Sequence, residues 1–146
     1  MYIFILFGMG ISSFMSSVTI ATLMYYGFSL LSPSLFLAVA LLLCALMSVA
    51  TGTSWGTVGT LGVVFIGIGS AMNIPLPLVA GMIVCGATFG DKMSPISDTT
   101  NLAAMSAGTD LYRHIYSMLF TTVPAFILTF LIFLFIGLGY ADQNLA

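Results

Sequence analysis

Long apolar runs alternate with short polar stretches along the chain. The apolar runs are residues 1–26, 34–50, 61–72, 78–86 and 115–138. A helix needs roughly 20 apolar residues to cross a membrane, and the first and last runs are long enough. The pattern predicts a single all-α membrane domain over residues 1–146 with these elements: a span at 1–28, a hairpin or two short spans at 34–72, a broken helix at 77–107, and a span at 114–139.

The most polar stretch of the chain, residues 86–101, lies between two apolar segments. It contains two of the four carboxylates, Asp91 and Asp98, and the only lysine, Lys92. Ionisable groups at membrane depth are costly to bury and usually serve a function. A hydroxyl-rich segment that also carries carboxylates is typical of the cation site of a secondary transporter. We therefore expect the functional site here.

The same stretch contains residues that oppose a continuous helix. Gly86, Gly90 and Pro95 are expected to interrupt it. Irregular backbone inside a membrane is tolerated only where it is buried in protein or lines a cavity. We predict a broken helix with one half before Gly90, an extended break, and a second half after Ser97.

A second polar stretch, residues 51–60, contains three glycines, four threonines and a serine but no charge. One possibility is a re-entrant hairpin whose tip lies near the membrane midplane, and the other is two full spans joined by an external turn. Glycines and hydroxyls without charge favour the hairpin, because they suit close backbone approach and oxygen ligation. As an interfacial anchor, Trp55 would fit the two full spans better.

The composition excludes several classes of protein. The chain is 60% hydrophobic and 4% charged, whereas a soluble domain carries roughly 25% charged residues. Six charged side chains cannot form a nucleic-acid-binding surface. The sequence shows no nucleophile–base pair and no zinc-ligand spacing, so we expect neither an enzyme nor a bound cofactor. The expected environment is the lipid bilayer.

Two motifs connect the sequence to a known family. They are Gly52-Thr-Ser-Trp-Gly-Thr57 and Gly90-Asp-Lys-Met-Ser-Pro-Ile-Ser-Asp-Thr-Thr-Asn101, with shorter matches at Thr22-Leu-Met-Tyr-Tyr-Gly27, Ser32-Pro-Ser-Leu-Phe36, Asp110-Leu, His114 and Thr121-Thr-Val-Pro124. In this combination the chain resembles the NhaC-type sodium/proton antiporters, whose larger ion transporter group includes sodium-lactate/malate-proton exchangers. It departs from that family at Phe14, Ser17 and Ala21, where Trp, Gly and Pro are expected.

The resemblance implies antiport of Na⁺ against H⁺ by a multi-pass protein of the inner (plasma) membrane. Members of the family are longer than this chain and resemble transporters built from inverted repeats. The chain therefore resembles one repeat unit of the N-terminal half, and the missing half or further copies of the chain are its expected partners. Two alternatives remain: a sodium- or proton-coupled carboxylate exchanger, and a truncated or split subunit that is inactive alone.

Within the motifs, Asp98 is the leading candidate for the carboxylate that binds Na⁺ when ionised and releases it when protonated. A helix N-cap is its structural alternative. Asp91 is the second candidate, and its alternative is an ion pair with Lys92, the expected charge partner, or with another helix. The other candidate ligands carry side-chain oxygens: Ser94, Ser97, Thr99, Thr100 and Asn101 in the longer motif, and Thr53, Ser54 and Thr57 in the shorter one.

Overall fold

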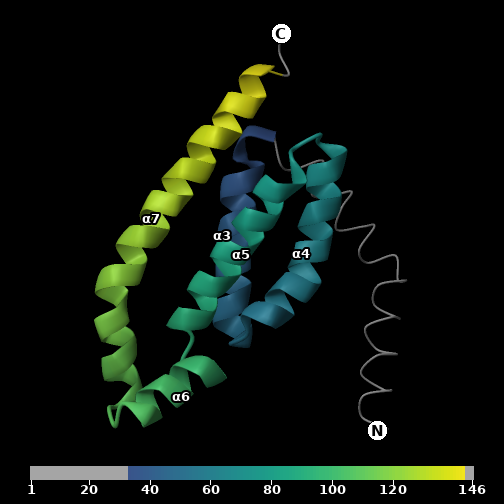
Figure 1. Cartoon of the computed structure of the whole chain (residues 1–146). Helices are drawn as coiled ribbons and strands as arrows, with labels where there is room; N and C mark the ends of the chain where they lie inside the picture. The colour runs from purple at the N-terminus through teal and green to yellow at the C-terminus, as the bar shows by residue number, and fades with distance from the viewer. Residues whose placement is uncertain (1–32, 144–146) are drawn as a thin grey trace, which may run out of the picture.

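The computed structural model describes residues 33–143, and every element in this range is an α-helix. Five helices follow one another (Figure 1): α3 (Pro33–Thr51), α4 (Ser54–Ala71), α5 (Leu76–Met93), α6 (Asp98–Ser106) and α7 (Leu111–Gln143). The all-α prediction is thus confirmed for this part of the chain. The expected span at residues 1–28, with Phe14, Ser17 and Ala21, lies outside the described residues.

Three of these helices are long and apolar enough to cross a membrane: α4, α5 and residues Leu111–Gly139 of α7. The shorter apolar helix Leu35–Thr51 lies between them and contacts α4, α5 and α7. Its buried side chains form the centre of the core, where the Phe36 ring meets the Phe65 ring edge-on. By contrast, α7 exposes many large apolar side chains, as expected for a surface that faces lipid.

α3 and α4 form a tight helical hairpin over the predicted residues 34–72. Gly52 makes the turn, with φ at 70°, a conformation that glycine adopts without steric cost. Thr53 then caps α4, because its side-chain oxygen accepts a hydrogen bond from the Gly56 N–H. Whether the tip of this hairpin lies at the membrane midplane stays a prediction.

The prediction that α5 breaks at Gly90 is wrong, because the helix continues through both Gly86 and Gly90 to Met93. The two glycines face α3. A Cβ at Gly86 would lie 2.6 Å from the Leu41 carbonyl oxygen, and one at Gly90 would meet the Ala45 carbonyl oxygen. Glycines four residues apart let two membrane helices approach closely, and this packing offsets the weak helix propensity of glycine.

The chain does break, but between Met93 and Asp98. Ser94 and Ser97 have extended backbones and flank a turn at Pro95 and Ile96. After this break the short helix α6 lies across the end of the bundle where α5 ends and where α3 turns into α4 (Figure 1). The two irregular segments also touch, since a Cβ at Gly52 would lie 3.0 Å from the Ser97 backbone nitrogen. This end of the bundle holds the polar residues of both motifs.

Candidate cation-binding site

Asp91 is the centre of the polar cluster. It lies in the last turn of α5 and is 7% exposed. The preceding residue, Gly90, is pressed against α3, so the backbone that carries the carboxylate lies close to the hairpin. A carboxylate can be buried without a large cost only when charges or hydrogen-bond donors compensate it.

Hydroxyl groups from three segments supply that compensation. Ser97, at the end of the break, donates to Asp91 Oδ1 at 2.8 Å. Ser54, the first residue of α4, donates to Oδ2 at 3.4 Å, and Thr99 of α6 donates to the same oxygen at 3.4 Å. The hydroxyls of Ser97 and Thr99 also lie 2.9 Å apart, so either can give its single proton to the other in place of an Asp91 oxygen. The result is a compact group of one carboxylate and three hydroxyls.

Two helix N-termini meet at this carboxylate. Ser54 begins α4, and Ser97 is the residue before the first turn of α6. The N-terminal end of a helix carries a partial positive charge and favours a nearby anion. The turn at Gly52 and the break at Ser94–Ser97 therefore place the first residue of α4 and the N-cap residue of α6 within hydrogen-bonding distance of the Asp91 carboxylate.

The structure places Asp98 differently from Asp91. Its side chain is exposed, and its Oδ1 accepts a hydrogen bond from the neighbouring Thr99 N–H at 2.9 Å. The groups that hydrogen-bond to the Asp91 carboxylate are Ser54, Ser97 and Thr99. Asp98 therefore lies at the start of α6, beside the cluster, and its role as a cation ligand stays a prediction.

The remaining candidates of the longer motif bond to the backbone. Thr100 is buried and its hydroxyl donates to the Asp91 carbonyl at 3.3 Å. Asn101 donates through Nδ2 to the carbonyls of Pro95 at 2.9 Å and Ser97 at 2.7 Å. Ser94 is buried, and its hydroxyl donates to the Val49 carbonyl at 2.8 Å. These side chains thus bond to backbone carbonyls in the break and near the ends of α3 and α5.

In the shorter motif, Ser54 is the candidate that reaches Asp91. The Thr53 hydroxyl oxygen caps α4. Thr57 is fully buried and donates to the Thr53 carbonyl at 3.0 Å, one turn earlier in the chain. Both residues shape the start of α4, which in turn fixes the position of Ser54.

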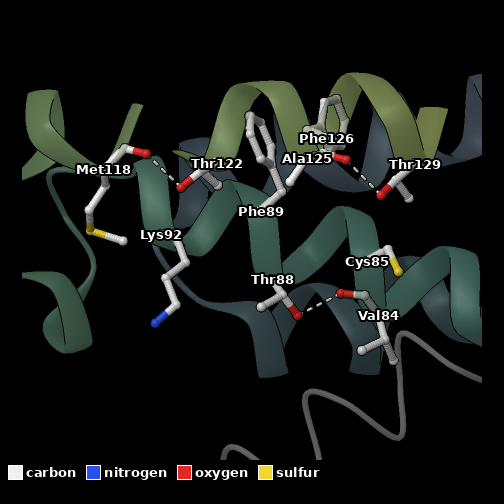
Figure 2. Close-up of a pocket in the computed structure, with 10 residues that line it drawn as sticks. All are labelled: Val84, Cys85, Thr88, Phe89, Lys92, Met118, Thr122, Ala125, Phe126 and Thr129. Carbon is white, nitrogen blue, oxygen red and sulfur yellow. Dashed lines mark hydrogen bonds between the residues drawn. The ribbon is translucent and has the colours of Figure 1, made fainter. Parts of the chain in front are cut away.

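Lys92 lies away from the carboxylate cluster. Its side chain is exposed and lines a groove of about 480 Å³ between α5 and α7. Figure 2 shows Phe89 and Phe126 between the two helices, with the Lys92 ammonium pointing away from α7. The hydrogen-bond partners of the Asp91 carboxylate are Ser54, Ser97 and Thr99, not Lys92. The role of Lys92 as a charge partner stays a prediction.

Ser48 contributes to the site although it belongs to neither motif. It is buried, and its hydroxyl donates to the Ala87 carbonyl on α5 at 2.6 Å. A serine in an apolar run that faces glycines on another helix is a recognisable signal for close helix contact. The sequence alone could not single out Ser48, because it does not show that α3 packs against α5.

The donor set of the site suits a small, hard cation. Carboxylate and hydroxyl oxygens are hard ligands. Among residues 33–143, no three His, Cys, Asp or Glu side chains gather as they would around a transition metal. The Asp91 carboxylate and its three hydroxyls thus form a donor set made of oxygen atoms alone.

The long apolar helices, with a polar cluster at one end of their bundle, are those of an integral membrane protein. Residues 86–145 match the model of the Na⁺/H⁺ antiporter family. The chain is 49% identical to the Na⁺/H⁺ antiporter NhaC of Alkalihalophilus pseudofirmus over 143 residues, which are 98% of this chain and 31% of that protein. These matches confirm the resemblance to the NhaC-type family.

Other relatives carry different names. The chain is 47% identical to the malate-2H⁺/Na⁺-lactate antiporter of Bacillus subtilis, over 92% of this chain and 29% of that protein. It is 41% identical to the arginine/ornithine antiporter ArcD of Halobacterium salinarum, over 93% of this chain and 28% of that protein. No solved structure matches the chain. The chain thus spans less than a third of the length of these curated relatives.

Proposed function

We propose that this chain forms the cation-binding part of a sodium/proton antiporter of the plasma membrane, with Asp91 as the shared binding group for Na⁺ and H⁺. The observation that carries the proposal is the buried Asp91 carboxylate, which three hydroxyls from separate segments surround. Intramembrane carboxylates that are buried and hydrogen-bonded in this way mark ion pathways.

Hydroxyl ligands suit such a site because each can both donate and accept. Without a cation, Ser54, Ser97 and Thr99 donate hydrogen bonds to the Asp91 carboxylate. When Na⁺ binds, each hydroxyl can rotate and present a lone pair to the ion. The carboxylate supplies the negative charge that a buried cation requires.

Exchange follows from competition for one carboxylate. Protonation of Asp91 removes the charge that binds Na⁺, and bound Na⁺ leaves no room for the proton. A carrier that exposes this group to each side of the membrane in turn then exchanges the two ions. Na⁺ and H⁺ are the transported ions in this proposal, and no covalent step is involved.

The site requires cover that residues 33–143 do not provide alone. Thr99 and Asp98 are exposed, and a polar surface facing lipid is costly. The chain also spans less than a third of the length of its curated relatives. We propose that a second half of the transporter, or another copy of this chain, covers the site.

The test is Na⁺-driven proton movement in vesicles that carry this chain, with Asp91→Asn and Asp98→Asn compared at equal expression. Asparagine keeps the shape of the side chain and removes its charge. We expect Asp91→Asn to abolish exchange and Asp98→Asn to retain most of it. If Asp98→Asn abolishes exchange and Asp91→Asn retains it, Asp98 is the carboxylate shared by Na⁺ and H⁺, as the sequence alone suggested.

If wild-type vesicles show no exchange although the chain is inserted, the chain is a split or truncated subunit, and the assay is repeated with the missing half supplied.

A carboxylate exchanger is the second candidate, because one relative is named a malate-2H⁺/Na⁺-lactate antiporter. Of the two groups that could hold a carboxylate, Asn101 already donates its amide to the Pro95 and Ser97 carbonyls, whereas the Lys92 ammonium is exposed. Uptake of labelled malate or lactate that depends on Lys92 would support that candidate over simple Na⁺/H⁺ exchange.

A further inference from the structure

We infer that Ser94 is a positioning residue of the site, fixing the distance between the Asp91 carboxylate and the Ser97 hydroxyl, and is not itself a cation ligand. The inference rests on the proposed function, because it concerns the same cation site. It assigns to Ser94 a role different from the ligand role that the motif alone suggests.

Two hydrogen bonds hold the Ser94 hydroxyl in place. The side chain is fully buried, and Oγ donates to the Val49 carbonyl of α3 at 2.8 Å. The same oxygen accepts a hydrogen bond from the Ile96 N–H at 3.3 Å. In Ser94 the single hydroxyl proton goes to Val49 and one of the two lone pairs accepts from Ile96. These bonds attach the hydroxyl to α3 and to the break, whereas the Asp91 carboxylate is bonded by Ser54, Ser97 and Thr99.

Ser94 lies midway along the chain between Asp91 and Ser97. It follows the last turn of α5, three residues after Asp91 and three residues before Ser97. The Ser94 N–H bonds to the Asp91 carbonyl, and the Ser97 N–H bonds to the Ser94 carbonyl, both at 3.3 Å. Ser94 is therefore tied through its backbone to both partners of the shortest hydrogen bond that the Asp91 carboxylate accepts.

Ser94 is attached to a part of α3 that packs closely against α5. Val49 belongs to the part of α3 that Gly90 contacts, and a Cβ at Gly90 would lie 2.8 Å from the Val49 backbone nitrogen. Ser48, next to Val49, donates to the Ala87 carbonyl of α5. The end of α5 thus meets α3 at two successive residues, by a hydrogen bond from Ser48 and by the close approach of Gly90 to Val49. Ser94 extends this contact beyond the end of the helix and into the break.

Without the Ser94 hydroxyl, the break would lose its attachment to α3 and the Ile96 N–H would lose its acceptor. The Ser97 hydroxyl would then occupy its position beside Asp91 for a smaller fraction of the time. Weaker Na⁺ binding follows, whereas the transport step with Na⁺ bound is unchanged. A lost hydrogen bond of this kind corresponds to a roughly 2- to 10-fold weaker affinity.

The experiment compares Ser94→Ala, Ser94→Thr and Ser97→Ala in the whole chain, in the vesicle assay and by hydrogen exchange of the Ile96 amide in ¹⁵N-isoleucine-labelled protein. We expect Ser94→Ala to raise the half-saturating Na⁺ concentration roughly 2- to 10-fold at unchanged maximal rate, and to speed exchange at Ile96. Threonine keeps the hydroxyl, so Ser94→Thr should have the half-saturating Na⁺ concentration of the wild type and its exchange rate at Ile96. Ser97→Ala should weaken Na⁺ binding but leave the Ile96 amide as protected as in the wild type.

Two results would overturn the inference. If Ser94→Ala weakens Na⁺ binding without speeding exchange at Ile96, Ser94 is a ligand. If it lowers only the maximal rate, Ser94 serves folding alone. If Ser94→Ala does not insert, Ser94→Cys carries the same test, because its thiol takes the place of the hydroxyl and is a weaker donor. Absence of any Na⁺-dependent exchange in the wild type would count against the proposed function, while the Ile96 measurement would still decide whether Ser94 holds the break in place.

Discussion

Gly90 of α5 lies directly against α3, with the Ala45 carbonyl oxygen at the place that a Cβ on residue 90 would occupy. One turn earlier, Gly86 has the same relation to the Leu41 carbonyl oxygen. These contacts bring two helix backbones together beside the site. They explain why the residue that immediately precedes Asp91 has no side chain.

This contact predicts a large effect of one methyl group. Gly86→Ala and Gly90→Ala should each destabilise the protein by roughly 1–3 kcal/mol, because the backbone of α3 must move away. Gly81→Ala, on the same helix, is the matched control, since a Cβ there has no neighbour within 4 Å. The control should be neutral or slightly stabilising. Thermal unfolding in detergent measures all three, and an equal loss at residue 81 would argue against the α3–α5 contact.

The turn between α3 and α4 permits a second comparison. Gly52 and Gly108 both have positive φ, 70° and 63°, so alanine is strained at either position. A Cβ at Gly52 would also lie 3.0 Å from the Ser97 backbone nitrogen, whereas one at Gly108 has open space around it. Gly52→Ala should therefore displace Ser97 and weaken Na⁺ binding, and Gly108→Ala should cost only stability. The half-saturating Na⁺ concentration of each variant separates the two effects.

Much of the fold could be predicted from the apolar pattern. The runs at residues 34–50 and 115–138 lie within α3 and α7, and the run at 61–72 ends one residue beyond α4. The polar stretch at residues 51–60 contains the hairpin turn. The sequence also indicated a broken helix within residues 77–107, although its break lies at Ser94–Ser97.

The details of the site could not be predicted, because they depend on which helices pair. Glycine in a sequence indicates either a break or a close contact, and only the position of α3 shows that Gly86 and Gly90 make contacts. For the same reason the sequence could not rank the two carboxylates. Asp91 is on the buried side of α5, whereas Asp98 begins an exposed turn of α6. Both lie in one polar run, and burial alone distinguishes them.

The two cysteines provide a test of the helix arrangement. Cys44 of α3 is fully buried in the core, whereas Cys85 of α5 is exposed along the groove that α5 forms with α7. A membrane-permeant maleimide should therefore label Cys85 and leave Cys44 unmodified. Mass spectrometry of the labelled protein, with Cys85→Ser as the control, measures this difference. Rapid labelling of Cys44 in folded protein would mean that α3 is not the central helix.

The proposed competition at Asp91 predicts a specific pH dependence of Na⁺ binding. A protonated carboxylate has no charge to offer Na⁺, so the half-saturating Na⁺ concentration should rise as the pH falls. If one proton competes with one Na⁺, the rise approaches about tenfold per pH unit on the acid side. Saturating Na⁺ should displace the proton and restore the bound state. Na⁺ titrations of purified protein at several pH values, followed by calorimetry, measure this relation.

Asp98→Asn and Ser97→Ala are the controls for this pH dependence. Asp98 is exposed and outside the hydroxyl cluster, so its variant should retain both the Na⁺ affinity and the pH dependence of the wild type. Ser97→Ala removes the 2.8 Å donor to Asp91, which should weaken Na⁺ binding at high pH but preserve the competition. If the pH dependence disappears in Asp98→Asn and survives in Asp91→Asn, the proton and Na⁺ compete at Asp98. The buried carboxylate would then serve to hold the break and the two helix ends together.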